Sequence, residues 1–105
     1  MIITVDLSRA PADVALQDPD DCNRFHVAAR GQRDDRRLAD ALEAARVGRM
    51  DGDDALVDVS AVRRLAEGHV SPGWGQDFDR MLDYAKTKGW LRGDAIQAHV
   101  EWEAT

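Results

Sequence analysis

The segment Ile96-Gln97-Ala98-His99-Val100-Glu101-Trp102-Glu103 decides the fold class of this chain. Apolar and polar residues alternate strictly along it, and side chains two positions apart lie on the same face of a β-strand. The pattern therefore predicts a C-terminal strand with one buried face and one polar face.

Two further segments show the same alternation. Ile3, Val5 and Leu7 share one face of the N-terminal segment, and a second alternating stretch covers 24–30 and ends at Gly31. Both stretches are rich in the apolar residues that strands favour. Because both ends of the chain are predicted to be strands, we expect a single sheet covered by helices.

Two helices are predicted from apolar spacing. One follows Asp34 or Asp35, either of which can cap its N-terminus. The other begins at Ser71-Pro72 and runs to about Lys88, with Gly89 as its left-handed terminator. The residues expected to face the core are Leu38, Ala41, Leu42 and Ala45 in the first helix and Phe78, Met81, Leu82 and Ala85 in the second.

The stretch between these helices is ambiguous. Its valines favour a strand at 55–59, followed by a helix that Ser60 caps and Gly68 ends. The alternative is one helix from Asp54, because apolar residues also recur there at helical spacing. We prefer the strand followed by the helix.

These elements predict a single α+β domain covering residues 1–105. The expected order is β-β-α-β-α-α-β, with a small three- or four-stranded sheet and helices packed on one of its faces. A hydrophobic fraction of 44% and a charged fraction of 32% are typical of a globular chain.

Composition also restricts the compartment and the partners. Cys22 is the only cysteine, so no intrachain disulfide can form, and Asp6 interrupts the N-terminal apolar run that a signal peptide would need. No apolar run approaches the roughly 20 residues that span a bilayer. We therefore expect a cytoplasmic protein without a membrane partner. The net charge of −6 disfavours nucleic acid as a partner.

Neither a metal nor an organic cofactor is expected. The acidic stretch starting at Asp51 fails as a calcium loop, because Ala55 and Val62 stand at ligand positions. Cys22 and His26 have no second ligand pair nearby in sequence, as a zinc site usually requires. No glycine-rich stretch has the spacing of a phosphate-binding loop.

Two histidines nevertheless share a feature of placement. His26 and His99 both fall on the polar faces of their predicted strands. They would be neighbours on the outer face of the sheet if these two strands pair. The simpler interpretation is that both are ordinary exposed sheet residues.

No catalytic residue is assigned. Ser60 and Ser71 lie outside the Gly-x-Ser-x-Gly pattern of a nucleophile elbow, and each is explained as a helix cap. Carboxylate pairs for acid–base catalysis cannot be selected where aspartate is this frequent.

Two places could bind a ligand. Arg33, Arg36 and Arg37 cluster where a strand leads into a helix, and their guanidinium groups could hold a carboxylate or a phosphate there. His69 and Trp74 flank a Gly/Pro turn between two helices, where binding residues often lie on a rigid scaffold. Of the aromatic residues, we expect Trp74 to be partly exposed and Phe78 and Trp90 to lie in the core.

No motif identifies a function. The chain is best described as a small noncatalytic intracellular binding or protein-interaction domain. Its partner would be a protein, either a second copy docked along a sheet edge or one dedicated partner. The alternative is a small enzyme or ligand-binding protein with a pocket near His69 and Trp74.

Overall fold

In the computed structural model, which describes residues 1–103, the chain forms an α+β fold with one seven-stranded mixed sheet and three helices. The strands are β1 (Ile2–Asp6), β2 (Asp13–Gln17), β3 (His26–Arg30), β4 (Gly48–Asp51), β5 (Asp54–Asp58), β6 (Leu91–Arg92) and β7 (Ala95–Glu103). The helices are α1 (Asp35–Ala44), α2 (Val59–Ala66) and α3 (Trp74–Thr87). The α+β class is confirmed, but the expected size of the sheet and the expected order of elements are wrong.

The strand order in the sheet is β2-β1-β3-β7-β5-β4, and the short β6 pairs with β7. β1, β3 and β7 run parallel to one another, whereas the remaining pairs are antiparallel. The C-terminal strand therefore lies inside the sheet, between β3 and β5, and its alternating sequence matches a strand with one buried face.

The strands that the sequence did not predict lack an alternating pattern. In β2, Val14, Ala15 and Leu16 are consecutive, and in β4 Met50 is the only large apolar residue. Both are edge strands, so each exists through pairing with a single neighbour. β6 has only two residues and depends wholly on β7.

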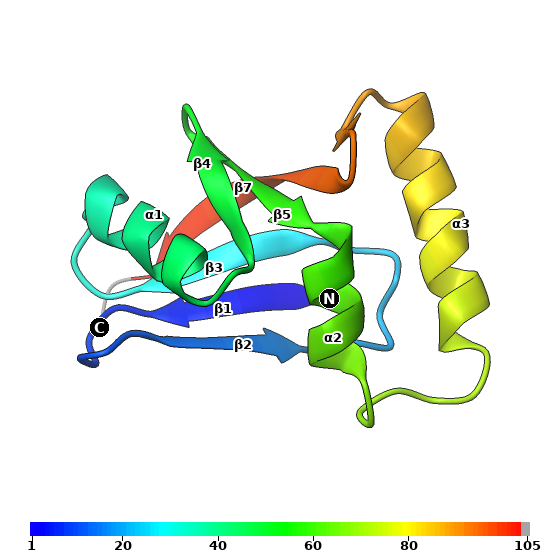
Figure 1. Cartoon of the computed structure of the whole chain (residues 1–105), viewed down its shortest axis with the longest axis horizontal. Coiled ribbons are helices and arrows are strands. Elements are labelled where there is room, and N and C mark those ends of the chain that lie inside the picture. The colour runs from blue at the N-terminus through cyan, green and yellow to red at the C-terminus, as the bar shows by residue number, and fades with distance from the viewer. Residues whose placement is uncertain (104–105) are drawn as a thin grey trace.

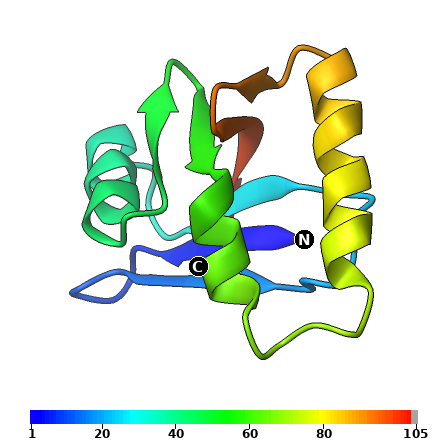
Figure 2. The ribbon, with the colours of Figure 1, turned by 45° about the vertical axis from the view of Figure 1, so that its right-hand side comes forward.

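The helices are distributed over one face and one end of the sheet. α1 and α2 lie on the same side of the sheet, and α3 runs across the strand ends near the starts of β1 and β3 (Figures 1 and 2). The expectation that all helices cover one face holds for α1 and α2 only. Between the sheet and the helices lies the core, which includes Met1, Ile3, Val5, Val27, Leu38, Leu42, Val57, Val62, Trp74, Phe78 and Ile96.

Helix α1 begins as predicted. Asp34 is its N-cap, and its carboxylate accepts a hydrogen bond of 3.0 Å from the backbone N–H of Arg37. The helix ends at Ala44. Gly48 starts β4, where a Cβ would lie 2.0 Å from the carbonyl oxygen of Leu56. This close approach explains the glycine.

The preferred interpretation of the ambiguous stretch is confirmed. β5 covers Asp54–Asp58, and α2 follows it without a loop. Ser60 is not the cap, because the helix already begins at Val59 and Ser60 lies in its first turn.

Helix α3 begins later than predicted. Gly73, with φ +88°, is its N-cap, and Ser71 lies outside the helix. The backbone N–H and the hydroxyl of Ser71 bind the carboxylate of Asp20 instead, at 2.9 and 3.1 Å. Ser71 therefore binds a residue that is distant in sequence and does not cap the helix.

The predicted terminator of α3 is confirmed. Gly89 has φ +77°, and its N–H donates to the backbone carbonyl of Lys86. The N–H of Trp90 donates back to the carbonyl of Ala85 at 2.8 Å. Of the predicted core face, Phe78 and Ala85 are buried. Met81 and Leu82 are half-buried, because the helix crosses the end of the sheet and does not lie flat on it.

Candidate functional site

The segment that the sequence suggested as a binding surface has its tryptophan in the core. Trp74 is only 9% exposed and stacks on Phe78 with ring centroids 4.8 Å apart. Its Nε1–H donates to the carbonyl of Pro19 at 2.6 Å, which ties α3 to the loop before β3. The expectation that Trp74 is partly exposed is therefore wrong. His69 is exposed, and a binding role for it stays a prediction.

The arginine cluster contacts several parts of the chain. Arg33 pairs with Asp35 at 3.3 Å and lies over the ring of Trp102. Arg37 donates to the carbonyl of Leu7 at 2.8 Å, so it joins α1 to the end of β1. Arg36 is exposed. Anion binding by this cluster stays a prediction.

Tyr84 and Trp90 are the large apolar side chains that the described residues leave most exposed, at 55% and 44%. Their rings meet edge to face with centroids 5.8 Å apart. Trp90 was expected in the core, and that expectation is wrong. The turn that ends α3 folds Trp90 back onto the exposed ring of Tyr84.

These two rings line a groove between α3 and the starts of β3 and β7. The groove consists of two adjoining hollows of about 620 and 710 Å³. One hollow follows α3, and the other extends over the open face of the sheet. We call the whole surface the aromatic groove. Residues that line both hollows are Asn23, Arg24, Phe25, Tyr84, Trp90 and Gln97.

Most charged groups at the α3 side of the aromatic groove have partners within the chain. The carboxylate of Asp20 accepts two hydrogen bonds from Ser71, and Asp77 pairs with Arg80 at 3.3 Å. Within residues 1–103, Arg24 has no ion pair or side-chain hydrogen bond, so its guanidinium group is available to a ligand.

Cys22 also lines this side of the groove. Burial raises the pKa of its thiol, and the nearby carboxylate of Asp77 raises it further. A raised pKa keeps the thiol protonated at neutral pH, and a protonated thiol is a poor nucleophile.

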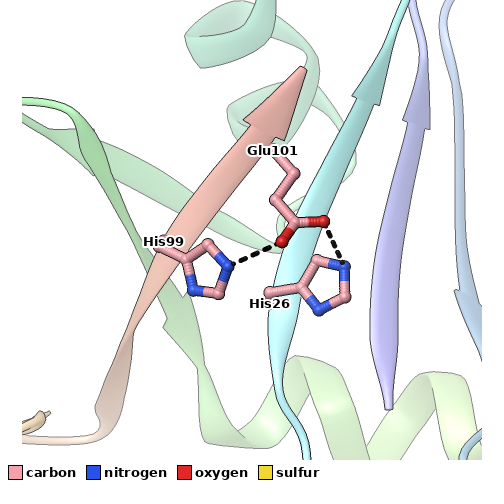
Figure 3. A group of neighbouring side chains, drawn as sticks. All are labelled: His26, His99 and Glu101. Carbon is pink, nitrogen blue, oxygen red and sulfur yellow. Dashed lines mark hydrogen bonds and ion pairs between the residues drawn. The ribbon is translucent and has the colours of Figure 1, made fainter. Parts of the chain in front are cut away.

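A cluster of His26, His99 and Glu101 lies at the other end of the groove (Figure 3). Nε2 of His26 lies 3.3 Å from one carboxylate oxygen of Glu101, and Nε2 of His99 lies 3.1 Å from the other. The two imidazole rings stack with centroids 5.3 Å apart. The hydrogen bond from His99, with the nearby His26, lowers the pKa of Glu101 below its ordinary value.

The proximity of the two histidines agrees with the sequence analysis, which placed both on polar strand faces. β3 and β7 are neighbours, and the pairing of Val27 with Val100 places His26 beside His99. Glu101 was not singled out, although its position two residues after His99 puts both on the same face of β7. The strand pairing, which sequence spacing does not reveal, brings the carboxylate to His26.

Comparisons with known proteins find no relative: no family model matches the chain, and neither the curated proteins nor the solved structures contain a significant match. Among residues 1–103, no helix has both the length and the apolar character needed to cross a membrane.

Proposed function

We propose that this protein is a small noncatalytic binding domain that holds a segment of a protein partner in the aromatic groove. The observation that carries the proposal is the exposed pair of Tyr84 and Trp90, which lies in a groove and not on a convex surface. Exposed aromatic side chains of this kind are typical of protein interfaces.

The physical basis is the apolar area that a partner would cover. Tyrosine and tryptophan bury a large area with few rotatable bonds, so ordering them on binding costs little entropy. Here the edge-to-face contact already restrains both rings before a partner arrives. Lys88, whose ammonium group lies 5.5 Å from the centroid of the Tyr84 ring, restrains this ring further.

Charge supports the choice of a protein partner over a nucleic acid. The chain carries a net charge of −6, which repels phosphate backbones. Within residues 1–103, Arg24 is the one unpaired cation that lines the groove, beside its aromatic rings. An apolar side chain near a carboxylate, as in a short protein segment, fits this combination.

At the α3 side of the groove, the chemistry favours binding over catalysis. The thiol of Cys22 is held in its protonated form, and the carboxylates of Asp20 and Asp77 are engaged with Ser71 and Arg80. An enzyme would instead be expected to hold an acid, a base or a nucleophile with a pKa adjusted for reaction at neutral pH.

A second candidate is the binding of a small molecule in the same groove. Volumes of about 620 and 710 Å³ lie within the range of small-molecule sites. This candidate moves the ligand site from the neighbourhood of His69 and Trp74 to the aromatic groove, because neither of these residues lines it.

The proposal is tested by comparing baits in an affinity capture from native lysate. The wild-type chain, Trp90→Ala, Tyr84→Ala and the control Glu43→Ala would be used, since Glu43 is exposed on α1, away from the groove. We expect one protein to be captured by the wild-type and Glu43→Ala chains and lost with both groove variants. Sedimentation of the purified chain shows whether that protein is a second copy. Equal capture by all four baits would contradict the proposal.

A further inference from the structure

We propose that His26, His99 and Glu101 form a three-ligand site for a divalent transition-metal ion, with zinc as the probe. The sequence alone predicted that no metal binds, because Cys22 is the only cysteine and the histidines are scattered along the chain. The pairing of β3 with β7 changes this expectation. The inference is independent of the proposed protein partner.

The sheet itself assembles the three ligands. His26 and His99 lie side by side on adjacent parallel strands, and Glu101 follows on the same face of β7. Glu101 is in register with Ala28, whose short side chain leaves space above β3. The Glu101 side chain leans across that space to His26 (Figure 3). Two rigid strands, not a flexible loop, therefore hold all three groups.

The distances match those within a metal site. One donor atom from each of His26, His99 and Glu101 can be chosen so that all three lie within 4.8 Å of one another. Zinc–ligand bonds of about 2.1 Å at tetrahedral angles place neighbouring ligand atoms about 3.4 Å apart. The His–Glu separations of 3.1 and 3.3 Å, which run to the two different carboxylate oxygens of Glu101, are close to that spacing.

The donor types select the class of metal. Two imidazole nitrogens and one carboxylate oxygen suit zinc and similar divalent transition ions, whereas calcium and magnesium prefer oxygen alone. Three protein ligands leave a coordination position for water or for a group from a partner. The ring of His26 is mostly sheltered, at 17% exposure, while His99 and Glu101 face solvent.

The surroundings also favour a cation. Asp54 of β5 lies opposite His99 of β7 in the strand register and lines the same hollow. Its carboxylate accepts a hydrogen bond of 2.7 Å from Gln97, which holds it in place beside the cluster. Arg24 is the opposing charge in this hollow. The net charge of −6 on the chain adds a general attraction for divalent ions.

The test is zinc titration of the untagged chain by calorimetry, with cobalt absorption spectra as a second readout. We expect one zinc ion per chain. His99→Ala and Glu101→Gln should each weaken binding by at least about tenfold, since losing even an outer partner of a ligand costs that much. His69→Ala is the matched control, because His69 is exposed and lies outside the cluster, and its affinity should equal that of the wild type.

Circular dichroism and unfolding midpoints establish that each variant is folded. If His99→Ala does not fold, the comparison rests on Glu101→Gln. The proposal is overturned by the absence of saturable binding at one ion per chain. It is equally overturned if His99→Ala and Glu101→Gln bind zinc as tightly as the wild type, or if His69→Ala loses binding with them.

Discussion

Tyr84 and Trp90 form an edge-to-face aromatic pair on the outside of the molecule, with ring centroids 5.8 Å apart, across the end of helix α3. The left-handed Gly89 reverses the chain and lets the N–H of Trp90 bind the carbonyl of Ala85. The element that ends the helix is thus also the element that presents the rings to solvent. This relationship places the candidate binding surface on rigid backbone.

The two tryptophans at the ends of α3 should differ sharply in their effect on stability. Trp74→Ala removes a buried ring that stacks on Phe78 and a hydrogen bond to Pro19, so we expect a loss of about 3–5 kcal/mol in the free energy of unfolding. Trp90→Ala removes an exposed ring and should cost about 1 kcal/mol or less. Urea denaturation measures both. Similar losses for the two variants would show that their burial is wrongly assigned.

The glycine that starts β4 should be irreplaceable. In Gly48→Ala, the new Cβ would lie 2.0 Å from the carbonyl oxygen of Leu56, and backbone atoms cannot move aside without separating β4 from β5. We expect a loss of about 3 kcal/mol.

Gly75→Ala is the matched control for this change. Gly75 lies in α3 with open space around it, so alanine should raise stability by about 0.4–1 kcal/mol. Thermal unfolding of both variants separates the steric effect from the general effect of removing a glycine. A Gly48→Ala chain as stable as the wild type would contradict the β4–β5 packing.

Cys22 should react slowly with thiol reagents. Burial raises the pKa of its thiol, with Asp77 as a further cause, so less thiolate is present at a given pH than for a free cysteine. Asp77→Asn should lower that pKa and speed the reaction. Asp79→Asn should change neither the pKa nor the rate, because Asp79 lies elsewhere on α3 and pairs with Arg63. A reaction rate that rises equally in both variants would contradict the assigned cause.

The elements predicted correctly are those whose local pattern agrees with their tertiary role. The alternating stretches at both ends of the chain form β1 and β7. Asp34 caps the start of α1 and Gly89 ends α3, as expected. In each case the local sequence and the packing favour the same conformation.

The errors arise where contacts between residues distant in sequence determine the local structure. Ser71 was expected to cap α3, but its polar atoms bind Asp20, and the helix begins after the left-handed Gly73. Trp74 was expected to be partly exposed. The carbonyl of Pro19, far away in sequence, supplies the partner that lets its indole be buried.

The candidate sites show the same division. Alternation alone placed His26 and His99 on polar faces, but only the β3–β7 pairing makes them neighbours. The exposure of Trp90 depends on where α3 crosses the end of the sheet, which periodicity within the helix does not specify. Sequence spacing thus identified some residues of the candidate sites but not how they lie relative to one another.

Site-specific photocrosslinking in cells tests whether the aromatic groove holds a protein partner. A photoreactive phenylalanine derivative would replace Tyr84 in the groove, or Glu43 on α1 as the control position. We expect a crosslink from position 84 to one protein, and that protein should be absent when the derivative stands at position 43. A position-84 chain that crosslinks no more than the control would contradict it.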